Sequence, residues 1–144
     1  MEIISSSTQE TKEFAHKIAS RLKGGEVLLL FGDLGAGKTT FTNFLVSELG
    51  FTDRVQSPTF VLHRKYSKSN GISSIKLVNH LDLYRLKNHS EFVDLGLAEM
   101  ITPDSITLIE WPDKYISYIK GTIIKLYFEN VSENVRRIHV PDIH

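Results

Sequence analysis

Residues 32–41, GDLGAGKTTF, place three glycines, a lysine and two threonines directly after the apolar run EVLLLF. Without Cβ atoms in the way, glycines allow backbone N–H groups to curl around phosphate oxygens. Lys38 can bridge the β- and γ-phosphates of a nucleotide, and the Thr39 hydroxyl can ligate Mg²⁺. A helix that begins after the loop adds unpaired N–H groups and the positive end of its dipole. The segment therefore predicts a loop that holds a phosphate chain.

The pattern G-x-x-x-x-G-K-[ST] is matched at every fixed position. The alternative is a chance match on a structural glycine turn, which should arise in well under ~1% of chains of this length. The spacing does not fit G-x-G-x-x-G, so a dinucleotide site is disfavoured. The eight residues of the motif are Gly32, Asp33, Leu34, Gly35, Ala36, Gly37, Lys38 and Thr39.

Two acids stand at the ends of apolar runs and are candidates to complete the site. Asp82 lies in KLVNHLDLYR, and Glu110 lies in ITLIEWPDK. Both positions suit a ligand site, because ligands gather at the carboxyl ends of parallel strands. Residue type favours Asp82 as the Mg²⁺ partner, whereas Glu110 follows the clearer buried strand. The sequence leaves open which of the two contacts the metal.

Three further residues have a structural and a functional interpretation. Strand periodicity places His80 and Asp82 on one face, and with no third ligand a histidine–carboxylate hydrogen bond is favoured over a metal site. For Trp111, the only tryptophan, composition favours core packing over a nucleotide contact. Ser57-Pro58-Thr59 is typical of a turn, although the Thr59 hydroxyl could instead reach Mg²⁺ or a phosphate as part of a switch.

Helical and strand periodicities alternate along the chain and predict a three-layer α/β fold with a mixed, partly parallel sheet. A capping box at 7–10 begins a helix whose apolar stripe runs to Leu22. The other expected elements are a strand at 26–31, a helix from about 37 to 50, strands at 60–66 and 72–84, a helical segment at 90–101 broken at Gly96, a strand at 105–110, and a C-terminal hairpin of 121–130 and 134–140 with a turn at 131–133.

Composition narrows the function further. The 144 residues predict a single domain over 1–144, and 17 basic residues balance 17 acidic ones, so bulk charge gives no support for direct nucleic-acid binding. The absence of cysteine excludes disulfides and thiolate metal sites. No apolar run approaches the ~20 residues of a membrane span, and no secretory signal is apparent, so we expect a cytoplasmic protein without a membrane partner.

Five segments in order, GDLGAGKTTF, SPTF, HLDLYRL, LGLAEM and LIEWPDK, resemble the bacterial TsaE family, also called YjeE. Its members are P-loop ATPases of tRNA threonylcarbamoyladenosine biosynthesis. The resemblance extends from the N-terminal helix to Lys114 and implies a P-loop NTPase-like fold. The residues Pro112-Asp113-Lys114 differ from the acid-Arg ending that is more usual in the family.

The resemblance also implies residue roles. Residues 32–40, which include Thr40, would hold the phosphates of ATP, with Mg²⁺ on Thr39. Thr59 would be a switch-type residue near the metal. Asp82 would be a catalytic acid near the attacking water or the metal, Glu110 the Walker-B-like acid, and Trp111 would lie beside the site.

The family further implies a Mg²⁺-dependent ATPase that acts on partner proteins, TsaB and TsaD, and meets tRNA only through them. TsaD transfers the threonylcarbamoyl group to adenosine 37. We expect slow hydrolysis by the isolated chain, because Arg54, Arg64 and Arg85 cannot be placed as an arginine finger from sequence. Two alternatives remain: a small-molecule kinase, for which no lid insertion is visible, and a nucleotide-gated binding module with incidental hydrolysis. A GTPase is disfavoured because no N-K-x-D signature is present.

Overall fold

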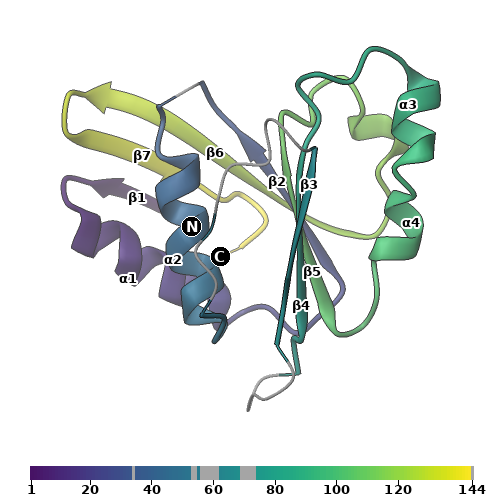
Figure 1. The fold of residues 1–144 in the computed structure, drawn as a ribbon. Helices are drawn as coiled ribbons and strands as arrows, with labels where there is room; N and C mark the ends of the chain where they lie inside the picture. Colours follow the sequence, from purple (N-terminus) through teal and green to yellow (C-terminus); the bar gives the residue numbers. More distant parts are fainter. Residues whose placement is uncertain (34, 53–54, 56–61, 69–73, 144) are drawn as a thin grey trace.

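The computed structural model describes residues 1–33, 35–52, 55, 62–68 and 74–143, which contain one seven-stranded sheet (Figure 1). The strands are β1 (Glu2–Ser5), β2 (Glu26–Phe31), β3 (His63–Ser67), β4 (Leu77–Asp82), β5 (Ser105–Glu110), β6 (Thr122–Ser132) and β7 (Val135–His139). The helices are α1 (Thr8–Ala19), α2 (Lys38–Glu48), α3 (His89–Asp94), α4 (Leu97–Met100) and the short 3₁₀ helix η1 (Ile116–Tyr118).

The sheet is mixed, as the sequence predicts. Its order is β1-β7-β6-β2-β5-β4-β3. The central strands β6, β2, β5 and β4 are parallel, whereas β3 at one edge and β7 and β1 at the other pair antiparallel. Strand β2 lies between two parallel neighbours and is buried on both faces, which explains its nearly continuous apolar sequence.

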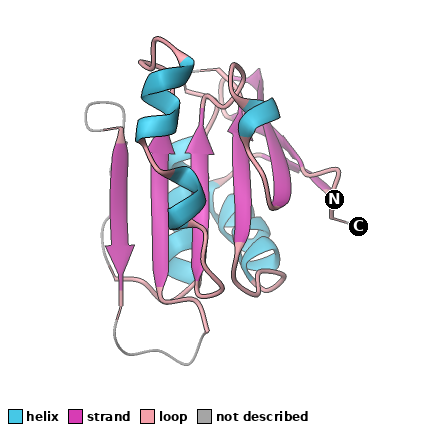
Figure 2. Cartoon of the chain, turned by 90° about the vertical axis from the view of Figure 1, so that its right-hand side faces the viewer, coloured by secondary structure: helices cyan, strands magenta, loops and turns pink. Residues whose placement is uncertain are grey.

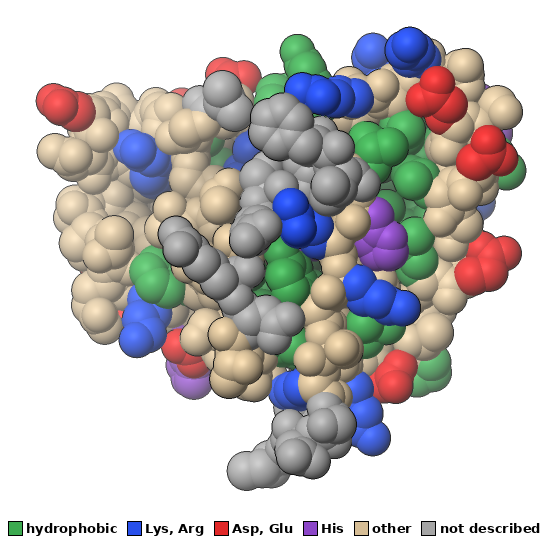
Figure 3. Space-filling view, viewed as in Figure 1, with side chains coloured by type: hydrophobic (Ala, Val, Ile, Leu, Met, Phe, Trp, Pro, Cys, Tyr) green, Lys and Arg blue, Asp and Glu red, His purple; other side chains and the backbone are tan. Residues whose placement is uncertain are grey.

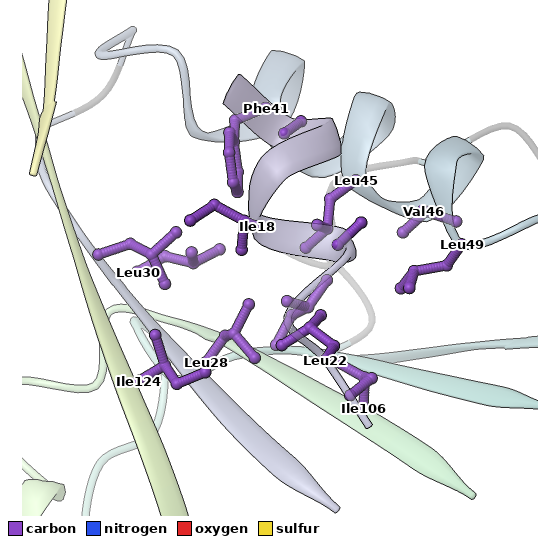
Figure 4. Packing of buried hydrophobic residues seen from close by; sticks show 14 of the residues in the cluster. Ile18, Leu22, Leu28, Leu30, Phe41, Leu45, Val46, Leu49, Ile106 and Ile124 are labelled. Atoms are coloured by element: carbon purple, nitrogen blue, oxygen red, sulfur yellow. The ribbon is translucent and has the colours of Figure 1, made fainter. Parts of the chain in front are cut away.

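Helices cover the sheet on both faces, which confirms the three-layer architecture (Figures 1 and 2). Leu28 and Leu30 of β2 point to the side of α1 and α2, where they share a core with Phe41 and Leu45 (Figure 4). Alternate residues of the same strand join the second core, which contains Phe92 of α3. The period of two in β2 therefore ties both helical layers to one strand.

Local signals explain where several elements begin and end. Ser7 caps α1, and its side chain accepts a hydrogen bond from the Glu10 N–H at 3.2 Å, as the capping box predicts. Asn88 caps α3 in the same way. Gly96 separates α3 from α4 with a left-handed φ of 67°, which confirms the predicted break.

The structure corrects the sequence prediction at three places. Strand β1 was not expected, because its four residues form a strand only by pairing with β7. Of the strand expected at 72–84, β4 comprises only residues 77–82; the Asp82 side chain accepts the Tyr84 N–H at 2.9 Å and turns the chain there. In the C-terminal hairpin, β6 continues through an irregularity at Asn130/Ser132, so the turn follows Ser132.

Gly32 is the residue that allows the chain to leave β2 alongside β6. Its φ is 145°, a conformation that side chains rarely adopt. A Cβ atom at this position would stand 2.6 Å from the carbonyl oxygen of Phe128 in β6, well inside contact distance. The first glycine of the motif is thus required by the packing of the sheet.

We predict that Gly32→Ala lowers the free energy of unfolding by about 3 kcal/mol, from backbone strain and overpacking together. Gly35→Ala is the matched control, because Gly35 also has a positive φ but open space where a Cβ would lie. Gly35→Ala should lower the free energy of unfolding only by the ~1–2 kcal/mol that a left-handed backbone conformation costs a residue with a side chain. Urea unfolding of both variants checks this, and equal losses would contradict the role of the β6 contact.

Candidate functional site

A cleft of about 590 Å³ lies where the carboxyl ends of β2, β5 and β4 meet the N-terminus of α2. One flank is formed by Asp82, Glu110 and Trp111, and its centre by residues 35–40 of the glycine-rich loop. The opposite flank comes from the start of α1 and from β7. The fold thus brings the loop and both candidate acids, which are far apart in sequence, into one cavity.

Lys38 is the first residue of α2 and is only 6% exposed. Its Nζ donates a hydrogen bond of 2.6 Å to the Gly32 carbonyl oxygen and lies 4.3 Å from the centroid of the Trp111 ring. Burial lowers the pKa of Lys38, although nearby acids, Glu110 first among them, act in the opposite direction. The ammonium group is therefore held between the start of the loop and the acidic flank.

Asp82 and Glu110 lie side by side, because they are direct partners in the parallel register of β4 and β5. They are 2% and 5% exposed, and both line the cleft. Glu110 is also the partner of Leu30 near the end of β2, just before the loop begins. Two carboxylates at adjacent strand ends, in one cleft with Lys38, Thr39 and Thr40, can bind a cation or orient a water molecule.

His80 fixes the position of one of these carboxylates. Its Nε2 lies 2.7 Å from Oε2 of Glu110, and the ring is fully buried. The favoured interpretation of His80 as a partner of a carboxylate is thus correct, and the partner lies on the neighbouring strand. Nδ1 of His80 is buried without a hydrogen-bond partner among the described residues.

Trp111 lies beside the loop and belongs to neither core cluster, in contrast to the expectation from composition. Its backbone has a positive φ of 55°, which is rare for a bulky residue and turns the chain sharply after β5. The ring faces Lys38 and lies 5.1 Å from the ring of Tyr84, centroid to centroid. This placement agrees with the position that the family resemblance implies.

The remaining candidate residues form two groups: some are not among the residues that the structure describes, and others are described but lie away from the cleft. Leu34, Arg54 and Thr59 lie outside the described residues. Arg64 on β3 and Arg85 after β4 are described, but they do not line this cleft.

Sequence reasoning missed the flank formed by the start of α1 and by β7. Arg136 and Ile138 come from β7, about one hundred residues after the loop. Only the pairing of β7 with β6, and of β6 with β2, places them there. No local pattern in the sequence marks these residues as part of the site.

The described residues contain no group of three or more His, Cys, Asp or Glu side chains that could hold a metal ion. Within the same part of the chain, no helix is long and apolar enough to span a membrane.

Comparison with known proteins identifies the family. A family model described as "Threonylcarbamoyl adenosine biosynthesis protein TsaE" matches residues 5–138. The tRNA threonylcarbamoyladenosine biosynthesis protein TsaE of Aquifex aeolicus is 37% identical over 143 residues, covering 96% of this chain and 94% of that protein. Its counterpart in Bacillus subtilis is 35% identical over 130 residues, covering 90% of this chain and 78% of that protein.

The fold has a counterpart among solved structures. A crystal structure of Bacillus subtilis YdiB superposes with a TM-score of 0.76 at 26% sequence identity, and the match covers 97% of this chain and 83% of that one. The site and the fold define a mixed α/β protein with a glycine-rich loop at the carboxyl ends of parallel strands. The chain belongs to the TsaE family, whose name ties it to the biosynthesis of threonylcarbamoyladenosine in tRNA.

We predict that His80→Leu costs about 2–3 kcal/mol of unfolding free energy, because the buried Glu110 carboxylate loses its hydrogen-bond donor. His80→Gln keeps an N–H group at the end of the side chain and should lose clearly less. Urea unfolding of both variants gives the comparison. Equal losses would show that the volume of the ring, and not its hydrogen bond, is what stabilises the fold.

The lowered pKa of Lys38 predicts a pH dependence. Below its ordinary pKa of 10.5, the unfolded chain binds the Lys38 proton more readily than the folded protein does. Stability therefore rises with pH in the interval between the lowered pKa and 10.5. Lys38→Met removes this contribution, so without nucleotide the wild type should gain unfolding free energy relative to the variant between pH 7 and pH 10. A difference that does not change with pH would refute this.

Proposed function

We propose that this chain is a Mg²⁺-dependent ATPase that supports threonylcarbamoylation of tRNA adenosine 37 by acting on a complex of TsaB- and TsaD-like proteins. The observation that carries the proposal is one cleft that is lined both by Lys38 and Thr39 of the loop and by the paired acids Asp82 and Glu110. Membership of the TsaE family gives the process.

The cleft suits a nucleotide in size and in chemistry. Its volume of about 590 Å³ falls inside the ~300–1,000 Å³ typical of small-molecule sites. Backbone N–H groups at the start of α2 and the Lys38 ammonium supply donors for phosphate oxygens. Phosphates would also relieve the cost of burying this lysine, since they place negative charge beside it.

The donor set also suits Mg²⁺ bound together with ATP. Mg²⁺ usually takes one or two carboxylates along with phosphate oxygens and water, and does not need an all-protein cage. Thr39, Asp82 and Glu110 would hold it or its water, and Thr59 is the further ligand that the family resemblance implies. When bound there, the ion would supply positive charge that offsets the negative charge developing on the phosphates.

The two acids are held before any ligand arrives. His80 orients Glu110 at 2.7 Å, and the Tyr84 N–H orients Asp82 at 2.9 Å. Carboxylates fixed in this way can position an attacking water without first reorganising. In our proposal Asp82 and Glu110 divide two tasks, orientation of the water and support of the metal.

Hydrolysis by the isolated chain should be slow. Among the described residues, Arg136 is the arginine that lines the cleft, and it lies on the flank opposite Asp82 and Glu110. Lack of an arginine at the γ-phosphate can cost 10³–10⁵ in rate. A partner complex that supplies or orders the missing charge would therefore stimulate turnover.

The distribution of charge agrees with an indirect role on tRNA. Basic and acidic residues are equal in number. On the described part of the face in Figure 3, Lys and Arg side chains are scattered over several elements. Proteins that grip nucleic acid alone use clustered positive charge. The partner proteins would hold the tRNA, and this chain would act on them.

We predict slow release of phosphate from ATP by the purified chain with Mg²⁺, and at least tenfold faster release when TsaB- and TsaD-like partners are added. Lys38→Ala should abolish both rates, because it removes the cation at the phosphates. The assay measures free phosphate and, in parallel, phosphorylated small molecules. Full-speed hydrolysis without partners would refute the proposal, and a phosphorylated acceptor would indicate a kinase instead.

Two further variants in the same assay separate catalysis from gating. Asp82→Asn and Glu110→Gln should keep nucleotide binding, which the fluorescence of the single Trp111 can report, yet slow hydrolysis about 10²–10⁴-fold. They should also stop tRNA modification by the reconstituted complex. Full modification by variants that bind but do not hydrolyse ATP would favour a nucleotide-gated binding module.

A further inference from the structure

Arg136 reaches the cleft from β7 and packs across the last glycine of the loop. Its Cγ, Cδ and Nε atoms lie 3.7–3.8 Å from the point where a Cβ atom of Gly37 would stand. Gly37 directly precedes Lys38 and Thr39, at the N-terminus of α2. The guanidinium stem thus runs alongside the start of the helix, where the loop offers its N–H groups.

The guanidinium group of Arg136 has more N–H groups than its hydrogen bonds within the described residues use. Its Nη1 donates to the carbonyl oxygens of Ser132 and Glu133 at 3.5 and 3.3 Å, which are long hydrogen bonds. A guanidinium carries five N–H groups, so most remain for a ligand. Among the described residues, no carboxylate forms an ion pair with Arg136.

The next residue along β7 shows a different arrangement. Arg137 is paired with Glu2 at 3.0 Å and with Glu129 at 3.5 Å. Strand periodicity directs Arg137 to the opposite face of the sheet, while Arg136 and Ile138 share the face that lines the cleft. The two neighbouring arginines thus differ in both partner and face, and only Arg136 is placed to meet a ligand in this cleft.

The sheet order indicates which phosphate Arg136 can meet. Strands β6 and β2 separate β7 from β5, so β7 lies about 14 Å from the strand that carries Glu110. If ATP binds as proposed, the acids would lie on the side of the γ-phosphate and the metal, and the loop would surround the β-phosphate. The α-phosphate would then lie on the flank of Arg136.

We propose that Arg136 is a nucleotide-binding residue that donates charge-assisted hydrogen bonds to the α-phosphate. This inference rests on the proposed binding of ATP. The contact is the same in ATP and ADP, because both carry an α-phosphate in the same place. Arg136 is therefore an affinity determinant for either nucleotide and does not act on the bond that breaks.

The test compares Arg136→Met with Arg137→Met in nucleotide affinity, measured by calorimetry with ADP and with ATP in Mg²⁺. Methionine keeps an unbranched stem against Gly37 and removes only the charged head. Arg136→Met should weaken both nucleotides by the same factor, about tenfold or more. Arg137→Met should leave both affinities unchanged. Partner-stimulated hydrolysis by Arg136→Met should show a raised KM with kcat retained.

Each outcome decides the inference. Unchanged affinities, or weaker ATP with unchanged ADP, would overturn the α-phosphate contact, and the second result would place Arg136 at the γ-phosphate. Equal losses of nucleotide affinity in Arg136→Met and Arg137→Met, together with lower melting temperatures of both variants, would assign both arginines a structural role only. Failure of the proposed function looks different: the wild type would bind neither nucleotide, and Lys38→Ala would change nothing.

Discussion

The parallel register of β2, β5 and β4 aligns Leu30, Glu110 and Asp82 across three neighbouring strands. Parallel strands run in the same direction, so their carboxyl ends share one edge of the sheet, and the chain must leave each strand there. The loop begins just after Leu30, Trp111 follows Glu110, and the turn at Tyr84 follows Asp82. A slip of one residue in either pairing would move an acid to the opposite face.

Burial of the polar side chains at this site costs free energy, and their hydrogen bonds offset part of that cost. Lys38, Glu110 and His80 are all nearly buried, and a buried polar group is unfavourable unless it is partnered. Nε2 of His80 and Oε2 of Glu110 are hydrogen-bonded to one another, and Lys38 is held by the Gly32 carbonyl oxygen. The lowered pKa of Lys38 shows that this arrangement does not fully compensate its charge. A phosphate chain would complete it, which is consistent with the proposed function.

Much of the fold could be predicted from the sequence, because its signals are local. The apolar run of β2, the caps of α1 and α3, and the break at Gly96 depend on residues within a few positions of one another. The meeting of the loop with Asp82 and Glu110 followed from one general rule on the ends of parallel strands. By contrast, β1 is too short to be recognised without its partner β7, which lies at the other end of the chain.

The same distinction explains why Arg136 was missed while Arg64 and Arg85 were considered. The sequence alone cannot place an arginine at the site, because proximity in the fold depends on the sheet order. The hairpin of β6 and β7 pairs with β2 through β6, so its outer strand reaches the flank of the cleft opposite the acids. The hairpin therefore contacts the glycine-rich loop at two of its glycines. Gly32 must lack a side chain because β6 passes beside it, and the Arg136 stem of β7 lies at ordinary contact distance from Gly37. The loop is therefore shaped by the hairpin as well as by the phosphates it is proposed to hold.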